Sequence, residues 1–179
     1  MRIVAGSRKG ARLFAPKGLD TRPTGDRVRE AVFNLLGPVD DADVLDLYAG
    51  SGAMGLEALS RGARRVTFVE SDREAAETIL RNLDKLRLEG AVVLREDAGR
   101  KLAADAVRGR RYDLVLVDPP YAMLARILPT LAAHLPAVLS ESGVAVVESD
   151  ARDEPDLPLP KRTSRRYGSS RVTVFEAPR

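Results

Sequence analysis

The chain has 179 residues, of which 44% are apolar and none is cysteine. This length fits one domain with a small appendage, and the apolar share is enough for a buried core. The absence of cysteine excludes a disulfide framework and thiolate metal sites. No apolar run approaches the roughly 20 residues of a membrane helix, and the first ten residues have no signal-peptide pattern. We therefore expect a soluble, cytoplasmic protein.

The net charge of +3 conceals two basic segments on an acidic body. Residues 1–30 hold eight Lys or Arg and three acids, and residues 161–171 hold five Lys or Arg and no acid, so each segment carries +5. The remaining residues carry −7. Segregated positive charge is typical of a surface that binds a polyanion. Two unrelated solvated surfaces are the alternative interpretation.

Residues 1–37 are predicted to form a small N-terminal extension that contacts RNA. Residues 2–15 have the pattern of a short β-hairpin, because two apolar runs flank the turn-like sequence SRKG. A loop follows, and apolar residues at helical spacing predict a helix over 25–36. Pro38 and three aspartates close this part of the chain.

Residues 38–179 are predicted to form the main domain, in which strands and helices alternate. Strands are expected at 44–48, 65–70, 91–97, 112–118 and 143–149, with helices between them at 53–61, 73–87, 98–107 and 122–138. Two further strands are expected at 161–168 and 170–177. The alternation is typical of an α/β fold with a parallel sheet covered on both faces. We expect seven strands, mostly parallel, with an antiparallel C-terminal pair.

A glycine-rich turn follows the first strand of this domain, in the sequence VLDLYAGSGAMG at 44–55. Gly50, Gly52 and Gly55 allow a sharp backbone turn and close approach of a ligand. Glu70 ends the second strand, where an acid can accept hydrogen bonds from a ribose. Together they predict a nucleoside cofactor at the carboxyl edge of the sheet, in preference to a tight turn without a ligand.

Two aspartates near this turn bear on the identity of the cofactor. Asp46 precedes the turn, and a carboxylate is a poor neighbour for the pyrophosphate of a dinucleotide but a good one for a cation. S-adenosylmethionine carries an ammonium group, a sulfonium centre and no phosphate. Asp97, placed at the end of the third strand, can accept a hydrogen bond from an adenine amino group. Its alternative role is to cap the helix that begins near Ala98.

The tetrapeptide Asp118-Pro119-Pro120-Tyr121 ends the fourth strand at the same edge. A nucleobase amine is a poor methyl acceptor because its lone pair is delocalised into the ring. The Asp118 carboxylate and the Pro119 carbonyl can hold the amine hydrogens, with the chain fixed by Pro120, and can stabilise the positive charge that develops on nitrogen. Tyr121 can stack on an extruded base. A plain turn with a core tyrosine is the structural alternative.

The sequences DLYAGSG, FVES and DPPY resemble motifs of the Rossmann-like class I methyltransferases that use S-adenosylmethionine, in the branch that modifies amino groups. The DPPY motif alone is shared with adenine and glutamine methyltransferases. The sequences RIVAGSRKGARL and TRPTGDRVREAVFNLL are more specific, and resemble the RsmD family over essentially the whole chain. That family methylates the exocyclic N2 of a guanine in bacterial 16S ribosomal RNA, within an assembled small subunit rather than naked RNA. The resemblance implies this activity, cofactor and partner here.

The resemblance also implies roles for individual residues. Catalytic roles fall on Asp118, Pro119, Pro120 and Tyr121. Cofactor contacts fall on Asp46, Tyr48, Ala49, Gly50, Gly52, Glu70, Ser71, Asp97 and Ala98. RNA contacts are expected from Arg22, Thr24 and Arg27, and the charge pattern adds Arg8, Lys9, Arg165 and Arg166. No metal site is expected, because the acids stand singly with no Cys or His cluster. We expect a monomer.

Three other functions stay open. The first is methyl transfer to adenine in DNA or RNA, or to a protein amide, by the same fold, and it gives the N-terminal hairpin no special role. The second is a nucleic-acid-binding module with a decayed cofactor site, against which the intact glycines, Glu70 and Asp118 argue. The third is an NAD-type dehydrogenase, which Asp46 and the DPPY motif disfavour.

Overall fold

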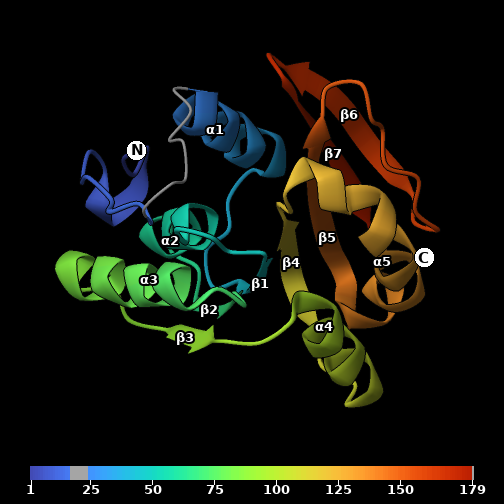
Figure 1. Cartoon of the computed structure of the whole chain (residues 1–179), viewed down its shortest axis with the longest axis horizontal. Coiled ribbons are helices and arrows are strands. Elements are labelled where there is room, and N and C mark those ends of the chain that lie inside the picture. The colour runs from blue at the N-terminus through green and yellow to red at the C-terminus, as the bar shows by residue number, and fades with distance from the viewer. Residues whose placement is uncertain (17–23, 179) are drawn as a thin grey trace.

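A seven-stranded sheet forms the centre of the molecule (Figure 1). The computed structural model describes residues 1–16 and 24–178. Its strands lie in the order β3-β2-β1-β4-β5-β7-β6. Strands β1 to β5 pair in parallel, whereas β7 is antiparallel to both β5 and β6. The bounds are β1 Asp43–Leu47, β2 Arg65–Val69, β3 Ala91–Leu94, β4 Tyr112–Val117, β5 Leu139–Asp150, β6 Lys161–Tyr167 and β7 Ser170–Glu176.

Helices cover both faces of this sheet (Figure 1). The bounds are α1 Thr24–Leu36, α2 Ala53–Ser60, α3 Arg73–Leu86, α4 Ala98–Val107 and α5 Leu124–Val138, with short 3₁₀ turns η1 Gly6–Arg8 and η2 Tyr121–Met123. Apolar side chains of α1, α2 and α3 share one core with the sheet, and those of α4 and α5 share a second core on the opposite face. The predicted α/β fold, with its antiparallel C-terminal pair, is confirmed.

Two strand boundaries differ from the prediction by more than one residue. Strand β3 ends at Leu94, three residues before Asp97, because Asp97 instead begins helix α4 as its N-cap. Strand β5 begins at Leu139, earlier than the predicted residue 143. Tyr112 pairs with Leu139 but Leu114 pairs with Val144, so β5 bulges between these two pairs. A bulge of this kind breaks the apolar alternation from which a strand is predicted.

The N-terminal segment, residues 1–16, is held by helix side chains more than by a strand ladder. The predicted hairpin reduces to one antiparallel bridge between Arg2 and Arg12, with η1 between them. Glu57 of α2 accepts hydrogen bonds from the backbone N–H groups of Val4 and Ala5. Buried backbone groups need partners, and here the helices provide them in place of a longer hairpin.

Helix α5 corrects the expectation that no apolar run reaches membrane-spanning length. The stretch Tyr121–Val138 has 18 residues and is apolar enough, by length and composition, to cross a membrane. However, α5 contains Pro129 and Pro136, and its buried residues pack in the second core. The buried share of this stretch is 28%, and these buried residues are the ones that pack in the second core.

Candidate active site

Strands β2, β1 and β4 end together at one edge of the sheet. In the parallel register Leu47 lies beside Val69 on one side and beside Val117 on the other. The next residue of each strand leaves the sheet at the same level. These residues are Tyr48, Glu70 and Asp118, all three predicted site residues. The register therefore brings together two parts of the predicted site, the cofactor loop and the DPPY tetrapeptide.

The loop between β1 and α2 has an unusual backbone. Tyr48, Gly50 and Gly52 all have positive φ, at 59°, 55° and 79°. At Gly52 an added Cβ would lie 3.0 Å from Ile79, and at Gly55 it would lie 2.3 Å from the Phe68 ring, so these glycines allow close helix packing. At Gly50 the nearest atom to an added Cβ is a backbone oxygen at 3.9 Å, which leaves this position open to a ligand.

Glu70 is fixed against the glycine loop. Its two carboxylate oxygens accept hydrogen bonds from the backbone N–H groups of Gly50 and Asp72, each at 2.8 Å. A carboxylate oxygen has two lone pairs, so each can still accept a hydroxyl group. Ser71 follows it at the surface. The predicted ribose acceptor thus stands next to the open Gly50 position.

Asp46 lies behind the loop and is only 1% exposed. Its carboxylate accepts a hydrogen bond of 3.0 Å from the N–H of Gly55. Burial raises the pKa of Asp46 to about 7, an effect that the Gly55 hydrogen bond opposes and the nearby negative charge of Glu70 reinforces. A cation beside this carboxyl group would favour its charged form, whereas a phosphate beside it would favour its protonated form.

Asp97 and Tyr48 are close enough for the charge of one to affect the pKa of the other. Asp97 accepts a hydrogen bond of 2.8 Å from the N–H of Arg100 and so caps α4, the alternative role considered for it, with Ala98 buried in the first turn. Burial raises the pKa of Tyr48, and the carboxylate of Asp97 raises it further, whereas Arg126 lowers it. A contact of Asp97 with adenine stays a prediction.

The DPPY tetrapeptide leaves β4 with its residues alternately exposed and buried. Asp118 and Pro120 are exposed, and Pro119 is buried. Tyr121 begins η2, and its hydroxyl lies 2.6 Å from Ser170 Oγ of β7 and donates to Glu148 of β5 at 3.3 Å. Strands far along the chain therefore fix the position of the tyrosine predicted to stack on the base.

The residues predicted to contact RNA have different surroundings. Lys9 and Arg27 are exposed, as are Arg165 and Arg166 on the edge strand β6. Arg8 is less exposed, and its guanidinium donates to the carbonyls of Ser7, Leu86 and Arg87. Thr24 begins α1, and Arg22 lies outside the described residues. Their contact with RNA stays a prediction.

Arg165 and Arg166 lie on opposite faces of the sheet. Arg165 lies opposite Val172, which belongs to the core beneath α1 to α3. Arg166 lies opposite Arg171. Residues directly opposite in an antiparallel pair share a face, and Glu148 also lies opposite Val172. Arg165 therefore shares the face on which Glu148 receives the Tyr121 hydroxyl.

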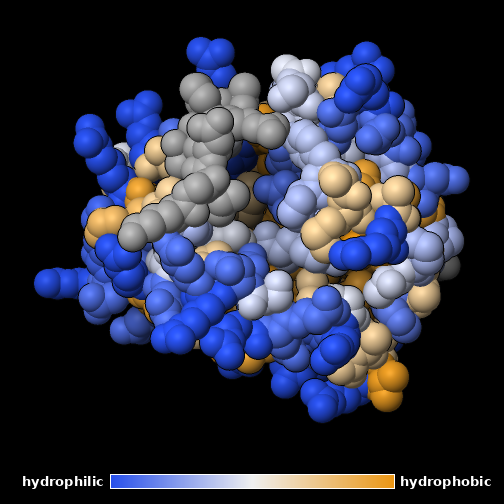
Figure 2. Space-filling model, viewed as in Figure 1, coloured by the Kyte–Doolittle hydropathy of each residue, from blue (hydrophilic) through white to orange (hydrophobic). Residues whose placement is uncertain are grey.

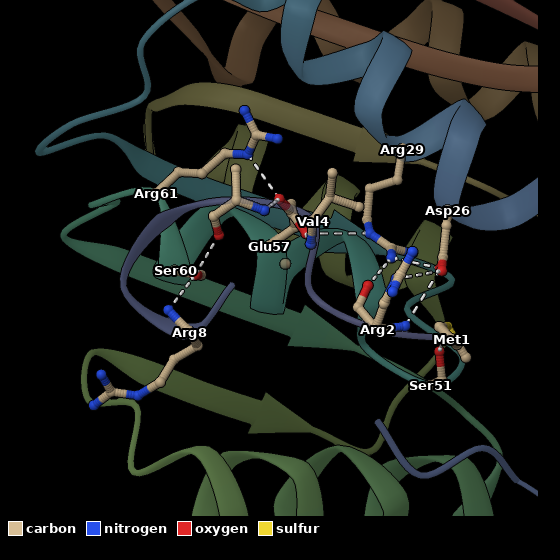
Figure 3. Close-up of polar contacts among 12 residues, drawn as sticks. Met1, Arg2, Val4, Arg8, Asp26, Arg29, Ser51, Glu57, Ser60 and Arg61 are labelled. Atoms are coloured by element: carbon tan, nitrogen blue, oxygen red, sulfur yellow. Dashed lines mark hydrogen bonds and ion pairs between the residues drawn. The ribbon is translucent and has the colours of Figure 1, made fainter. Parts of the chain in front are cut away.

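A buried charge cluster joins the N-terminal segment to α1 and α2, and sequence reasoning missed it. Figure 3 shows Val4, Arg29 and Arg61 directed at Glu57, which is fully buried. Arg29 of α1 lies 3.3 Å from the Glu57 carboxylate, and Arg61 lies 2.8 Å from it. Arg29 also donates to the Arg2 carbonyl. Charged residues in helices are usually exposed, so the sequence carries no signal for this cluster.

Asn82 of α3 was also missed, and it touches the predicted cofactor loop. Its side chain is fully buried. The amide oxygen accepts from the N–H of Phe14 at 2.8 Å, and the amide nitrogen donates to the carbonyls of Phe14 and Ser51 at 3.0 and 3.2 Å. One side chain thus connects the N-terminal segment with the glycine loop. Across residues 1–16 and 24–178, no group of three or more His, Cys, Asp or Glu is placed to hold a metal.

Comparison with known proteins gives a consistent family assignment. A family model described as conserved hypothetical protein 95 matches residues 1–176. The putative rRNA methyltransferase YlbH of Bacillus subtilis is 40% identical over 98% of both chains. Ribosomal RNA small subunit methyltransferase D of Escherichia coli is 44% identical over 68% of this chain, and the match spans 60% of that protein.

A solved structure agrees with this assignment. The putative methyltransferase yhhF of Escherichia coli superposes with a TM-score of 0.84 at 35% identity, over 99% of this chain and 97% of the other. The fold is accordingly that of the class I methyltransferases. On these matches the chain belongs to the family described as conserved hypothetical protein 95, the RsmD family that its motifs resemble.

Proposed function

We propose that the protein transfers the methyl group of S-adenosylmethionine to the exocyclic N2 of a guanine in 16S ribosomal RNA. The observation that carries this proposal is the shared edge of β2, β1 and β4. Three features lie at this edge, at the ends of adjacent strands. They are the open position at Gly50, the fixed carboxylate of Glu70 and the exposed carboxylate of Asp118. A nucleoside cofactor and an amine acceptor can therefore meet at one place.

The residues at this edge fit S-adenosylmethionine. Glu70 stands beside Gly50, where its spare lone pairs suit ribose hydroxyls. The buried carboxylate of Asp46 suits the ammonium group, directly or through a water molecule, and would repel a pyrophosphate. When bound, the cofactor would supply an electrophilic methyl carbon, and transfer of this carbon to nitrogen would break its bond to sulfur and leave S-adenosylhomocysteine, a neutral thioether.

The DPPY residues hold the acceptor amine. The Asp118 carboxylate and the Pro119 carbonyl accept its two N–H bonds, which turns the nitrogen lone pair toward the methyl carbon. As the nitrogen becomes positive, both acceptors bind it more strongly than in the ground state, and this lowers the barrier. The methylated amine then loses one proton to water. Tyr121 supplies a ring for the extruded base, in a position set by its hydroxyl contact with Ser170.

The choice of ribosomal RNA rests on the relatives and on charge. Two relatives at 40% and 44% identity carry names that state rRNA methylation. Residues 1–37 act as an RNA-contacting extension of the domain formed by 38–179. Arg165 adds a cation on the face of the sheet where Glu148 receives the Tyr121 hydroxyl. The protein works as a cytoplasmic monomer on assembled small subunits. The alternative acceptor is adenine N6 or a protein amide.

The test is the transfer of labelled methyl from S-adenosylmethionine to three substrates. These are small ribosomal subunits from a strain that lacks the protein, naked 16S RNA and duplex DNA, with nuclease digestion to identify the labelled nucleoside. We expect N2-methylguanosine, mainly from subunits. Label in N6-methyladenine or in protein would overturn the acceptor but leave the chemistry, and transfer to none would overturn the proposal.

Two variants make this test specific to the site. Asp118→Ala should abolish transfer while cofactor binding, followed by calorimetry, stays within about threefold, because Asp118 is proposed to hold the acceptor and not the cofactor. Asp156→Ala is the matched control, since Asp156 is exposed in the loop between β5 and β6. Equal activity of the two variants would remove Asp118 from the mechanism.

A further inference from the structure

A cationic surface with an aromatic residue at its centre joins the N-terminal segment to α3. We define the Phe14 patch as Arg12, Phe14, Arg81 and Lys85. Phe14 is 38% exposed, and the other three are exposed. The Arg81 guanidinium and the Lys85 ammonium each lie 4.5 Å from the centre of the Phe14 ring. Lys85 also donates to the Arg12 carbonyl at 2.7 Å.

Within the part of the chain that the structure describes, the cations of the Phe14 patch have no acidic partner. Among residues 1–16 and 24–178, none of Arg12, Arg81 and Lys85 forms an ion pair with a carboxylate. By contrast Arg73, on the same helix, lies 2.7 Å from Glu77. Asp84 lies three residues after Arg81, about 60° around α3 from it, but the two side chains form no ion pair.

The ring holds these cations in place. A cation over an aromatic face is attracted by the ring quadrupole, and at exposed sites this is worth about 0.5–1 kcal/mol per contact. The two long side chains therefore lose less conformational freedom when they bind a ligand. Arg8 extends the positive surface through its hydrogen bond to the Arg87 carbonyl. Figure 2 shows hydrophilic side chains over most of this face of the molecule, including the left side, where Figure 1 places the N-terminal segment and α3.

The Phe14 patch is connected to the active site. Asn82 binds the backbone of Phe14 and the carbonyl of Ser51 in the glycine loop. Helix α3 begins at Arg73, just after Glu70, and Arg81 and Lys85 lie about 12 to 18 Å further along its axis at 1.5 Å per residue. A strand of about four or five stacked nucleotides spans this distance. RNA bound at the edge of the sheet can thus reach the patch.

We propose that the Phe14 patch binds the phosphate backbone of the substrate RNA on the flank of the active site. The inference rests on the proposed function, and it adds a surface on α3 that charge runs in the sequence do not reveal. Lys and Arg contacts to phosphates give affinity and salt dependence without base selection. The patch accordingly positions the RNA, and the DPPY tetrapeptide acts on the base.

The test compares variants of one helix that lose the same charge. The variants are Arg81→Gln, the double variant Arg81→Gln/Lys85→Gln, and Arg73→Gln as the control whose cation is already paired with Glu77. The dissociation constants of naked 16S RNA and of unmodified small subunits are measured against salt concentration. Circular dichroism and thermal unfolding check that each variant is folded.

Loss of one phosphate contact should weaken binding roughly four- to sixfold at about 0.15 M salt and reduce the salt slope by about 0.7 to 0.9. We expect this for Arg81→Gln, about twice the change in slope for the double variant, and no change for Arg73→Gln. The kcat at saturating RNA should stay the same. A salt slope in the double variant equal to that of the wild type would refute RNA binding by the Phe14 patch. An equal loss of affinity in Arg73→Gln would refute it as well, and neither result would contradict the proposed methyltransferase activity. Wild-type protein that binds no RNA would overturn both.

Discussion

The buried carboxylate of Asp46 should make stability depend on pH in an unusual direction. Its pKa is about 7 in the folded chain and about 3.8 in an unfolded one. Between these values the folded state holds a proton that the unfolded state lacks, so the free energy of unfolding falls as pH rises, by about 1.4 kcal/mol per pH unit. The contribution is fully present below about pH 4 and is lost through pH 7, a total of about 4 kcal/mol.

Asp46→Asn removes this titration while keeping an oxygen that can accept from the Gly55 N–H. Other acids titrate in both proteins, so the informative quantity is the difference in unfolding free energy between the variant and the wild type. As pH rises from 4.5 to 8, the unfolding free energy of the variant should increase by about 3 to 4 kcal/mol relative to that of the wild type. Urea unfolding with linear extrapolation at four pH values measures it. Asp156→Asn, at an exposed site, is the control.

The same carboxylate should report the cofactor. A cation near Asp46 lowers its pKa, so binding of S-adenosylmethionine near pH 7 should release about half a proton, and Asp46→Asn should release correspondingly less. Calorimetry in buffers of different ionisation enthalpy measures this release. A stability difference that does not change with pH would refute the raised pKa, and equal proton release by both proteins would refute the proximity of the cation.

Three further outcomes follow from contacts described above. Gly6→Ala should lower the free energy of unfolding by about 2 kcal/mol or more, because the new Cβ would lie 1.8 Å from a backbone oxygen of α2. Gly10→Ala, at a similar φ but in open space, should lower the free energy of unfolding less. Equal shifts of the unfolding temperature in the two variants would contradict this prediction. Asn82→Leu should lower the free energy of unfolding by about 2 to 4 kcal/mol, because three backbone groups lose their hydrogen-bond partner. Chemical denaturation measures this change, and an unchanged midpoint would be evidence against a stabilising role of Asn82. Tyr121→Phe should lower kcat about three- to tenfold in single-turnover methyl transfer, because the ring loses its anchor at Ser170, and an unchanged rate would show that the anchor is dispensable.

Local patterns predicted most of the fold because each element carries its own signal. A buried parallel strand is a short apolar run, and an amphipathic helix has apolar residues at helical spacing. The helix predicted at 98–107 coincides with α4 for this reason. The strand predicted at 91–97 is longer than β3, because the prediction places Asp97 at the end of the strand. The position of Asp97 before Ala98 also suits an N-cap, which is its role in the structure.

The contacts that the sequence could not reveal lie between distant segments. Asn82 and Phe14 are 68 residues apart, and Tyr121 and Ser170 are 49 residues apart. Each pair depends on strand register and on how helices pack, which no local pattern encodes. The Glu57 cluster has the same origin, since its partners come from the N-terminal segment, α1 and α2. Motif spacing predicted the glycine loop and the DPPY tetrapeptide as site elements, and tertiary packing determines which contacts hold them in place.

The placement of β7 has a consequence for how the protein is made. This strand is inserted between β5 and β6, and Ser170 at its start holds the Tyr121 hydroxyl. During synthesis the elements up to α5 leave the ribosome first, so the glycine loop and Asp118 can be in place while the tyrosine still lacks its anchor. The part of the site proposed to hold the cofactor can thus form on the nascent chain, whereas the part proposed to hold the base is completed only after residue 170 has emerged.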